Sequence, residues 1–285
     1  MDKTPVRLEL KGVSYAYPDG TPALGEIDIQ VKRGEFTGIL GANGSGKTTL
    51  LKVMDGLIRD FEGEVLLDGA EVRRLSPRDI YRKMGLVFQN PDDQLFAPNV
   101  YEDVEFGPVN MGCPEKEVKE RVERALAAVG MEGYGKKGIN RLSFGQKKRV
   151  SIAGLLAMGH EILLLDEPTA GLDPMGEYRM MELLTELNRE KGVTIVMATH
   201  SVDLVPIFLH RLYILSKGKI KRGGLPEEVF TAPREMAEVK LRLPHIAELI
   251  WKLKNEDGLK LDKIPLTVGE ARRMLLKVIE GDGNS

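Results

Sequence analysis

A glycine-rich stretch at residues 41–48, with the sequence GANGSGKT, constrains the fold of this chain more than any other feature. It stands between an apolar run, Phe36–Leu40, and a segment of helical character at residues 48–55. Glycines let backbone N–H groups turn inward around phosphate oxygens, and the N-terminus of the following helix adds the positive end of its dipole. In this context the pattern G-x-x-x-x-G-K-[ST] predicts a phosphate-binding loop on a strand–loop–helix unit.

We expect this loop and the residue after it to bind the phosphates of ATP. Lys47 would reach the β- and γ-phosphates, and the Thr48 hydroxyl would be a ligand of Mg²⁺. A glycine-rich turn that matches by chance is the alternative, but the flanking strand and helix favour the functional interpretation. The expected ATP-binding residues of this segment are Gly41, Ala42, Asn43, Gly44, Ser45, Gly46, Lys47, Thr48 and Thr49.

The hydrophobic pattern of the rest of the chain also indicates an α/β fold. Short apolar runs alternate with helical patterns, as expected for strands buried on both faces of a sheet. These runs are Phe36–Leu40 and residues 85–88, 162–165 and 194–198. Ahead of the loop, VRLELKGVSYAY and EIDIQV alternate polar and apolar residues, which predicts an antiparallel β region. The expected fold is therefore a P-loop NTPase core with an antiparallel β subdomain.

Two changes of pattern divide the chain further. Between about residues 90 and 159 the pattern is mainly helical, which predicts a helical subdomain inserted into the α/β body. The sequence GGLP at residues 223–226 marks a second boundary, after which the pattern is again helical. We therefore expect an ATPase domain over residues 1–224 and a small helical C-terminal extension over residues 225–285. This extension would either pack on its own domain or make contact within a dimer.

The composition argues against several other classes of protein. The chain has 285 residues with 41 basic and 43 acidic side chains, so no bulk charge marks a binder of nucleic acid. No apolar run approaches the roughly 20 residues of a membrane helix, so a role at a membrane would need a partner. One cysteine, Cys113, cannot form an internal disulfide, and four histidines without a Cys/His cluster do not favour a zinc site.

Two carboxylates follow the apolar run at residues 162–165. Asp166 and Glu167 are neighbours at the end of a predicted strand, so their side chains point to opposite sides and can take separate roles. Asp166 would hold Mg²⁺, and Glu167 would polarise the attacking water as a general base. Two solvated acids are the plainer interpretation, but the phosphate-binding loop upstream favours the catalytic one.

Residues 142–146, with the sequence LSFGQ, are the most discriminating stretch. Ser143 and Gln146 have the spacing of a capping box, which would begin the helical segment that follows. The serine hydroxyl, with Gly145 allowing close backbone approach, would also make a second anion site at a helix N-terminus. The residues alone leave both interpretations open.

With this stretch, the chain resembles the ABC family of ATPases along most of its length and in the expected order of motifs. LSFGQ matches the signature motif LSGGQ, with Phe144 where the family usually has glycine. The sequence GLD, which ends in Asp173, matches the D-loop. The resemblance implies that these residues act on the ATP of a second subunit. They are Ser143, Phe144, Gly145, Gln146 and Asp173.

The resemblance assigns roles to three further residues. Gln89 in VFQNP falls at the Q-loop, which implies contact with ATP and a place beside Thr48 and Asp166 as a ligand of Mg²⁺. His200 falls at the switch histidine, and with Glu167 it would be catalytic. Tyr17 matches the aromatic residue that stacks on adenine. Taken singly, these three could equally be a polar loop residue, a strand-end histidine and a surface residue.

After the Q-loop the resemblance narrows to the ATPases of energy-coupling-factor importers, especially the cobalt-import kind. It rests on NPDDQLF at residues 90–96, EDVEFGP at 102–108 and LPHIAE at 243–248. In that group two ATPases pair beneath a transmembrane coupling protein and a substrate-binding membrane subunit. The resemblance implies an ATPase at the cytoplasmic face of the cell membrane that drives uptake of a metal ion or a vitamin.

The resemblance also implies that Asp92 and Asp93 dock a basic helix of the coupling protein. A solvated acidic face is the plainer interpretation of these acids. Whether the second ATPase is another copy of this chain or a paralogue is left open by the sequence.

Two other functions compete with this one. A soluble ABC ATPase that acts on nucleic acid or ribosomes usually carries two ATPase halves or a long coiled-coil insertion, whereas this chain has one P-loop and one signature. A regulatory GTPase would need an NKxD-type motif, which the sequence lacks. The basic runs at residues 147–149 and 217–222 have no interleaved aromatic residues, so we expect no nucleic-acid partner and interpret the second run as an exposed hairpin.

Overall fold

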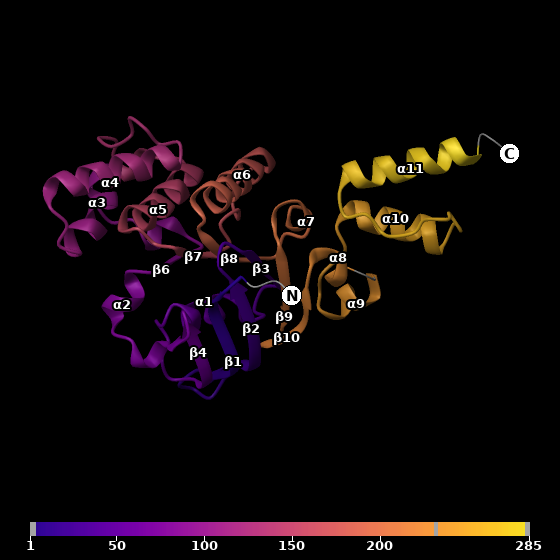
Figure 1. Ribbon diagram of the computed structural model, residues 1–285, viewed down its shortest axis with the longest axis horizontal. Coiled ribbons are helices and arrows are strands. Elements are labelled where there is room, and N and C mark those ends of the chain that lie inside the picture. The colour runs from indigo at the N-terminus through magenta and orange to yellow at the C-terminus, as the bar shows by residue number, and fades with distance from the viewer. Residues whose placement is uncertain (1–3, 231–232, 283–285) are drawn as a thin grey trace.

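The computed structural model of the protein describes residues 4–230 and 233–282. Figure 1 shows the strands in the body of the molecule, with helices α3, α4 and α5 on one side and α10 and α11 on the other. Two sheets and the helices around them give the mixed α/β architecture that the sequence predicts.

The first sheet is antiparallel and has the strand order β2-β1-β4-β5. Its strands are β1 (Val6–Ala16), β2 (Pro22–Lys32), β4 (Glu62–Leu67) and β5 (Ala70–Glu71). In the turn between β1 and β2, where proline, aspartate and glycine follow Tyr17, the Tyr17 N–H donates to the Thr21 carbonyl and the Gly20 N–H donates to the Tyr17 carbonyl. The predicted antiparallel β region is therefore confirmed.

The second sheet forms the centre of the molecule, with the order β10-β9-β3-β8-β7-β6. Its strands are β3 (Phe36–Leu40), β6 (Met84–Val87), β7 (Ile162–Asp166), β8 (Thr194–Thr199), β9 (Arg211–Ser216) and β10 (Lys219–Gly224). Only β10, at one edge, pairs antiparallel to its neighbour. The carboxyl ends of the parallel strands therefore meet at one edge of the sheet, which is where ligands bind in open α/β sheets.

The helices fall where the patterns predict them. Between β6 and β7 the chain is mainly helical, with η2 (Pro91–Asp93), α3 (Val100–Asn110), α4 (Glu115–Ala128), η3 (Ile139–Arg141) and α5 (Phe144–Met158). The other helices of the body are α1 (Lys47–Met54), η1 (Val72–Arg74), α2 (Pro77–Tyr81), α6 (Pro174–Lys191) and α7 (Val205–Phe208). The C-terminal region holds α8 (Pro226–Val229), α9 (Pro233–Glu238), α10 (His245–Asn255) and α11 (Val268–Asp282).

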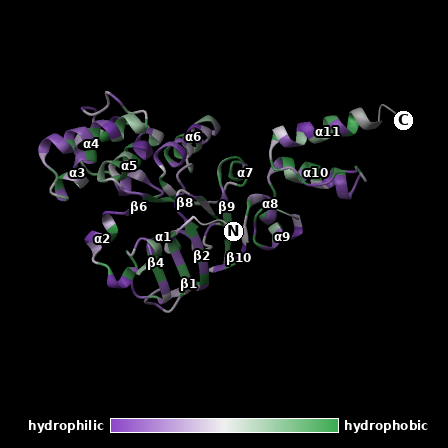
Figure 2. Ribbon diagram, viewed as in Figure 1, coloured by the Kyte–Doolittle hydropathy of each residue, from purple (hydrophilic) through white to green (hydrophobic). Residues whose placement is uncertain are grey.

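The central sheet is buried on both faces, as its continuous apolar runs require. Along β7, Leu163 and Leu165 join the hydrophobic cluster of the helical side, whereas Ile162 and Leu164 join the cluster that contains α1 and the antiparallel sheet. Successive side chains on a strand point to opposite faces, so the parallel strands β3, β6, β7, β8 and β9 each contribute to both clusters. In Figure 2 hydrophobic (green) segments lie along the strands of the sheets.

The C-terminal region packs on the α/β body and also carries a small cluster of its own. Phe230, Leu243 and Ala247 are buried in the cluster of the helical side, and Arg242 pairs with Asp203 after β8. Helices α10 and α11 contact each other through a separate cluster with Ile250, Leu261 and Ala271 at its centre. Over the described residues, no helix is both long and apolar enough to cross a membrane.

Candidate nucleotide site

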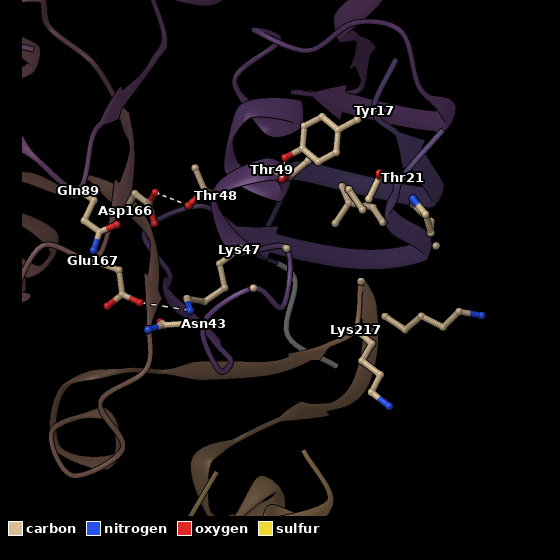
Figure 3. A pocket seen from close by; sticks show the side chains of 18 residues that line it. Tyr17, Thr21, Asn43, Lys47, Thr48, Thr49, Gln89, Asp166, Glu167 and Lys217 are labelled. Carbon is tan, nitrogen blue, oxygen red and sulfur yellow. Dashed lines mark hydrogen bonds and ion pairs between the residues drawn. The ribbon is translucent and has the colours of Figure 1, made fainter. Parts of the chain in front are cut away.

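A cavity of about 900 Å³ opens at the carboxyl ends of the parallel strands (Figure 3). The glycine-rich loop between β3 and α1 forms its floor, and the turns after β1 and β9 line its rim. Of the residues expected to bind ATP or to act on it, the cavity brings together Tyr17, Asn43, Gly44, Gly46, Lys47, Thr48, Thr49, Gln89, Asp166 and Glu167. Gly41, Ala42 and Ser45 lie in the loop but outside the cavity lining.

The loop adopts a conformation that depends on its glycines. Gly44 and Gly46 have φ angles of 77° and 106°, in the region that other residues rarely adopt. A Cβ atom on Gly41 would lie 2.5 Å from the Ser45 hydroxyl, so this position also excludes a side chain. The buried Lys47 ammonium donates to the Gly41 carbonyl at 2.7 Å, which keeps it folded over the loop.

The geometry around Thr48 and Asp166 fits a bound Mg²⁺ ion. The Thr48 hydroxyl donates to Asp166 Oδ2 at 2.6 Å, while the buried Oδ1 atom has no hydrogen-bond partner. Burial raises the pKa of Asp166, and the hydrogen bond from Thr48 opposes that rise. The described residues include no group of three or more His, Cys, Asp and Glu placed to hold a metal. Mg²⁺ needs no such group, since it binds through one or two carboxylates together with substrate phosphates.

Glu167 directly follows β7, and its side chain faces the glycine-rich loop. Its carboxylate lies 3.2 Å from the Lys47 ammonium and 2.9 Å from His200 Nδ1, and Figure 3 shows its contact with Lys47. The side chains of Glu167 and Lys47 are 6% and 7% exposed, so the contact between them is largely shielded from water, whereas the His200 side chain is 54% exposed. Asp166 and Glu167 therefore reach different partners, as expected for neighbours at a strand end. His200 is the one predicted catalytic residue that does not line the cavity; it contacts Glu167 instead.

Tyr17 lies at the opposite end of the cavity from Glu167, as Figure 3 shows. Its hydroxyl is 2.7 Å from the Thr49 hydroxyl, and its ring meets that of Tyr15 edge to face; the residue is 42% exposed. An exposed aromatic face beside the phosphate-binding loop suits stacking on a base.

Three lining residues in the turn between β9 and β10 were not predicted. Lys217, Gly218 and Lys219 line the cavity, although the basic run was interpreted as an exposed hairpin. The hairpin itself is present, but the Gly218 N–H donates to the Ser45 carbonyl at 2.9 Å and so holds the turn against the loop. The signal in the sequence is the pair Lys217-Gly218 directly after an apolar run, which suits a tight hairpin turn. Both residues have positive φ angles in the structure.

The signature and D-loop residues line a different cavity, of about 340 Å³, and no residue lines both. The capping box is complete: the Ser143 hydroxyl accepts the Gln146 N–H, and the Gln146 side chain accepts the Ser143 N–H. Asp173 caps α6 by accepting the Gly176 N–H at 2.7 Å. The Phe144 ring packs against the D-loop, where a Cβ atom on Gly171 would lie 3.0 Å from it. The structural interpretations of these residues therefore hold, and the anion site is not excluded by them.

The acids proposed for docking already have contacts within the chain. Asp92 pairs with the Lys147 ammonium at 2.5 Å, and Asp93 accepts from the Asn90 side chain at 3.3 Å. Close along the chain, the exposed rings of Phe96 and Phe106 meet edge to face with centroids 4.7 Å apart. This segment therefore combines partly paired acids with exposed apolar surface.

Comparisons with known proteins agree with this geometry. A family model described as ABC transporter matches residues 24–170. The chain is 73% identical to a putative ABC transporter ATP-binding protein of Geobacter sulfurreducens, over 94% of this chain and 96% of the relative. It is 47% identical to the energy-coupling factor transporter ATP-binding protein EcfA of Methanococcus maripaludis, over 96% and 99%. The structure of cbiO1 from Clostridium perfringens, described as part of the ABC transporter complex cbiONQ, matches with a TM-score of 0.76 and 44% identity. That match covers 87% of this chain and 99% of cbiO1.

Proposed function

The chain belongs to the ABC transporter ATPases, as the ATP-binding subunit of a transporter of the energy-coupling-factor type, and on this premise we propose that it drives uptake of a metal ion or a vitamin. Hydrolysis of ATP supplies the free energy, and the substrate crosses through membrane partners. Cobalt is the metal ion that the sequence resemblance favours. We place the chain at the cytoplasmic face of the membrane, held there by a transmembrane coupling protein and a substrate-binding subunit.

The observation that carries the proposal is the placement of Glu167 opposite Lys47. Both side chains are buried and paired, at the point where the γ-phosphate of ATP would lie if Lys47 bound it. A phosphate competes with Glu167 for the same ammonium, so ATP binding would exchange the ion pair for a lysine–phosphate contact. The released carboxylate is then free to take a proton from the attacking water. His200, in contact with Glu167, would hold it in that orientation.

Thr48, Gln89 and Asp166 are the residues that would hold Mg²⁺. The orphaned Oδ1 atom of Asp166 and the hydroxyl of Thr48 supply oxygen ligands of the kind this ion prefers. When bound with ATP, Mg²⁺ neutralises charge on the phosphates. Gln89 follows β6 and precedes the helical subdomain. A contact between Gln89 and the bound Mg²⁺ or ATP would therefore transmit the presence of nucleotide to α3 and α5.

We propose further that the site is completed by a second ATPase subunit. Ser143 stands at the N-terminus of α5, a helix of 15 residues, where backbone N–H groups and the helix dipole favour an anion. Its cavity is separate from that of Lys47, which supports a site shared between two chains. Two subunits, either two copies or this chain with a paralogue, would sandwich ATP between the loop of one and the signature of the other.

A reconstituted transport assay tests the proposed function. The tagged chain is purified with its membrane partners, placed in vesicles, and supplied with ATP and either radioactive cobalt(II) or a labelled vitamin. We expect ATP-dependent uptake of one of these, and its loss when Glu167→Gln replaces the wild-type chain. If membrane proteins co-purify but ATP stimulates uptake of neither, the importer assignment is wrong.

A further inference from the structure

Lys148 is a buried lysine to which the mechanism above gives no part. It lies near the start of α5, five positions after Ser143, and its residue is 1% exposed. A buried ammonium is unfavourable unless its donors find partners. Here Nζ donates to the backbone carbonyl of Glu167 at 2.7 Å and lies 5.1 Å from the centre of the Phe144 ring.

The carbonyl that Lys148 contacts belongs to an unusual turn. Glu167 has a φ angle of 49°, in the left-handed region that residues with a side chain seldom adopt. The same carbonyl accepts the Ala170 N–H at 3.1 Å, and the Glu167 N–H donates to the Ala198 carbonyl at 3.0 Å. A backbone conformation of this kind persists when surrounding contacts hold it, and such residues cluster at active sites.

The ammonium keeps its charge in this position. Burial lowers the pKa of Lys148 to about 8, while the carboxylates of Glu167 and Asp166 act in the opposite direction. The group is therefore mostly protonated at neutral pH and makes a charge-assisted hydrogen bond to the carbonyl, which is stronger than a neutral one.

We propose that Lys148 is a positioning residue for hydrolysis, which fixes the turn from which the Glu167 carboxylate reaches the attacking water. Lys148 belongs to α5, the helix whose N-terminus presents Ser143 to the ATP of the partner subunit. Its bond to the Glu167 carbonyl therefore links that helix to the base that acts on the subunit's own ATP. The Phe144 ring, where the family usually has glycine, packs beside the same ammonium. This inference rests on the proposed role of Glu167 as the base.

The first test separates positioning from simple structural support. Lys148→Met keeps an unbranched side chain, one atom shorter, and removes its donor, whereas Lys148→Gln, of the same length as methionine, keeps a donor at the end of the side chain. We expect Lys148→Met to lower kcat by about tenfold to a hundredfold, the scale of a misplaced catalytic group, with the Kd for ATP changed by less than about threefold. Lys148→Gln should retain several times more activity than Lys148→Met. Lys119→Met, on the exposed face of α4, is the matched control.

Either of two results would overturn the proposal. One is a kcat for Lys148→Met within about twofold of wild type. The other is a loss of ATP affinity as large as the loss of kcat, with Lys148→Gln and Lys148→Met equally impaired. Thermal unfolding of each variant verifies that the folded protein is being compared.

The second test asks in which subunit Lys148 acts. In a mixture of Lys148→Met with Ser143→Arg, one composite site has an intact loop, Lys148 and Glu167 in one subunit and an intact Ser143 in the other. That mixture should recover activity. A mixture of Lys148→Met with Lys47→Ala should not, because its only intact loop lies beside the altered Lys148. The reverse pattern would show that Lys148 acts through the signature instead.

A third mixture, Ser143→Arg with Lys47→Ala, keeps the two proposals distinguishable. It contains Lys148 in both subunits and reports on the shared site alone. If it fails to recover activity, a site shared between two copies of this chain is rejected, while the change in kcat of Lys148→Met still decides the role of Lys148.

Discussion

At the scale of single residues, the account depends most on Glu167. Its carboxylate contacts Lys47 and His200, and Glu167→Gln removes the charge while keeping the shape. We expect ATP binding to persist and hydrolysis to fall by roughly 10²–10⁴, the usual contribution of a general base. The wild-type carboxylate also repels the γ-phosphate, and the substitution removes this repulsion. The ATP-bound dimer should therefore live longer. Phosphate release and dimer lifetime are the measurements, with Glu186→Gln on α6 as control; a wild-type rate for Glu167→Gln would remove it from the mechanism.

A second residue-scale prediction concerns Asp55, at the C-terminal end of α1. Burial raises the pKa of Asp55 to about 7, and its Oδ1 atom has no hydrogen-bond partner. The folded state therefore binds the proton more tightly than the unfolded chain, so stability is lost as the pH rises from about 4 through 7. At pH 8 the buried charge would cost roughly 4 kcal/mol.

Asp55→Asn cannot ionise and should escape this loss. The difference in Tm between the variant and wild type should grow from pH 5 to pH 8 in favour of Asn, and then level off. A difference that stays constant with pH would show that the ionisation of Asp55 does not affect stability.

At the scale of elements, the strands could be predicted because β3, β7 and β8 are buried on both faces and so read as continuous apolar runs. Their order in the sheet could not, because β3 lies between β8 and β9, which come far later in the chain. This pairing of strands that are distant in sequence is also why the place of Lys217 and Lys219 in the cavity was not predicted. Their turn reaches the loop only because β9 pairs with β3, a tertiary fact that no local pattern carries.

The segment that follows Gln89 gives the prediction for the membrane partner. Reversal of both charges, with Asp92→Lys and Asp93→Lys, should uncouple transport and weaken the complex with the coupling protein, while ATP still binds. Losing one partner of a desolvated charge pair costs roughly 2–5 kcal/mol, and an exposed pair costs far less.

The reversal also breaks the ion pair between Asp92 and Lys147, so a control is needed. Lys147→Met breaks the same pair but keeps both acids, and it should retain the complex. Co-purification and ATP affinity are measured for both variants. If the double reversal keeps the complex and transport at wild-type levels, these acids are a solvated face.

At the scale of the whole molecule, the C-terminal extension is expected to help hold two ATPases together without ATP. Deleting it would expose the cluster that Phe230 and Leu243 enter, so substitutions on α11 are a cleaner test. Leu276 and Ile279 are 39% and 67% exposed, and Figure 2 shows hydrophobic and hydrophilic residues interleaved along this helix. Fully burying such a side chain contributes roughly 1.5–3 kcal/mol.

Leu276→Asp with Ile279→Asp should therefore shift the nucleotide-free protein toward monomer in sedimentation experiments. Lys277→Asp, on the same helix, changes charge without removing apolar surface and should not. A monomer for wild type and variant alike would mean that the extension only packs on its own domain.

The central claim is that one ATP is hydrolysed between two subunits, and complementation tests it most directly. Ser143→Arg blocks the signature but leaves Lys47 intact, and Lys47→Ala does the reverse, so neither variant alone should hydrolyse ATP. Mixed in equal amounts, they form dimers in which one of the two sites has both elements. The account predicts recovery of up to about a quarter of the wild-type ATPase rate in the mixture. Full activity of Ser143→Arg by itself would contradict it, because hydrolysis would then need only one subunit.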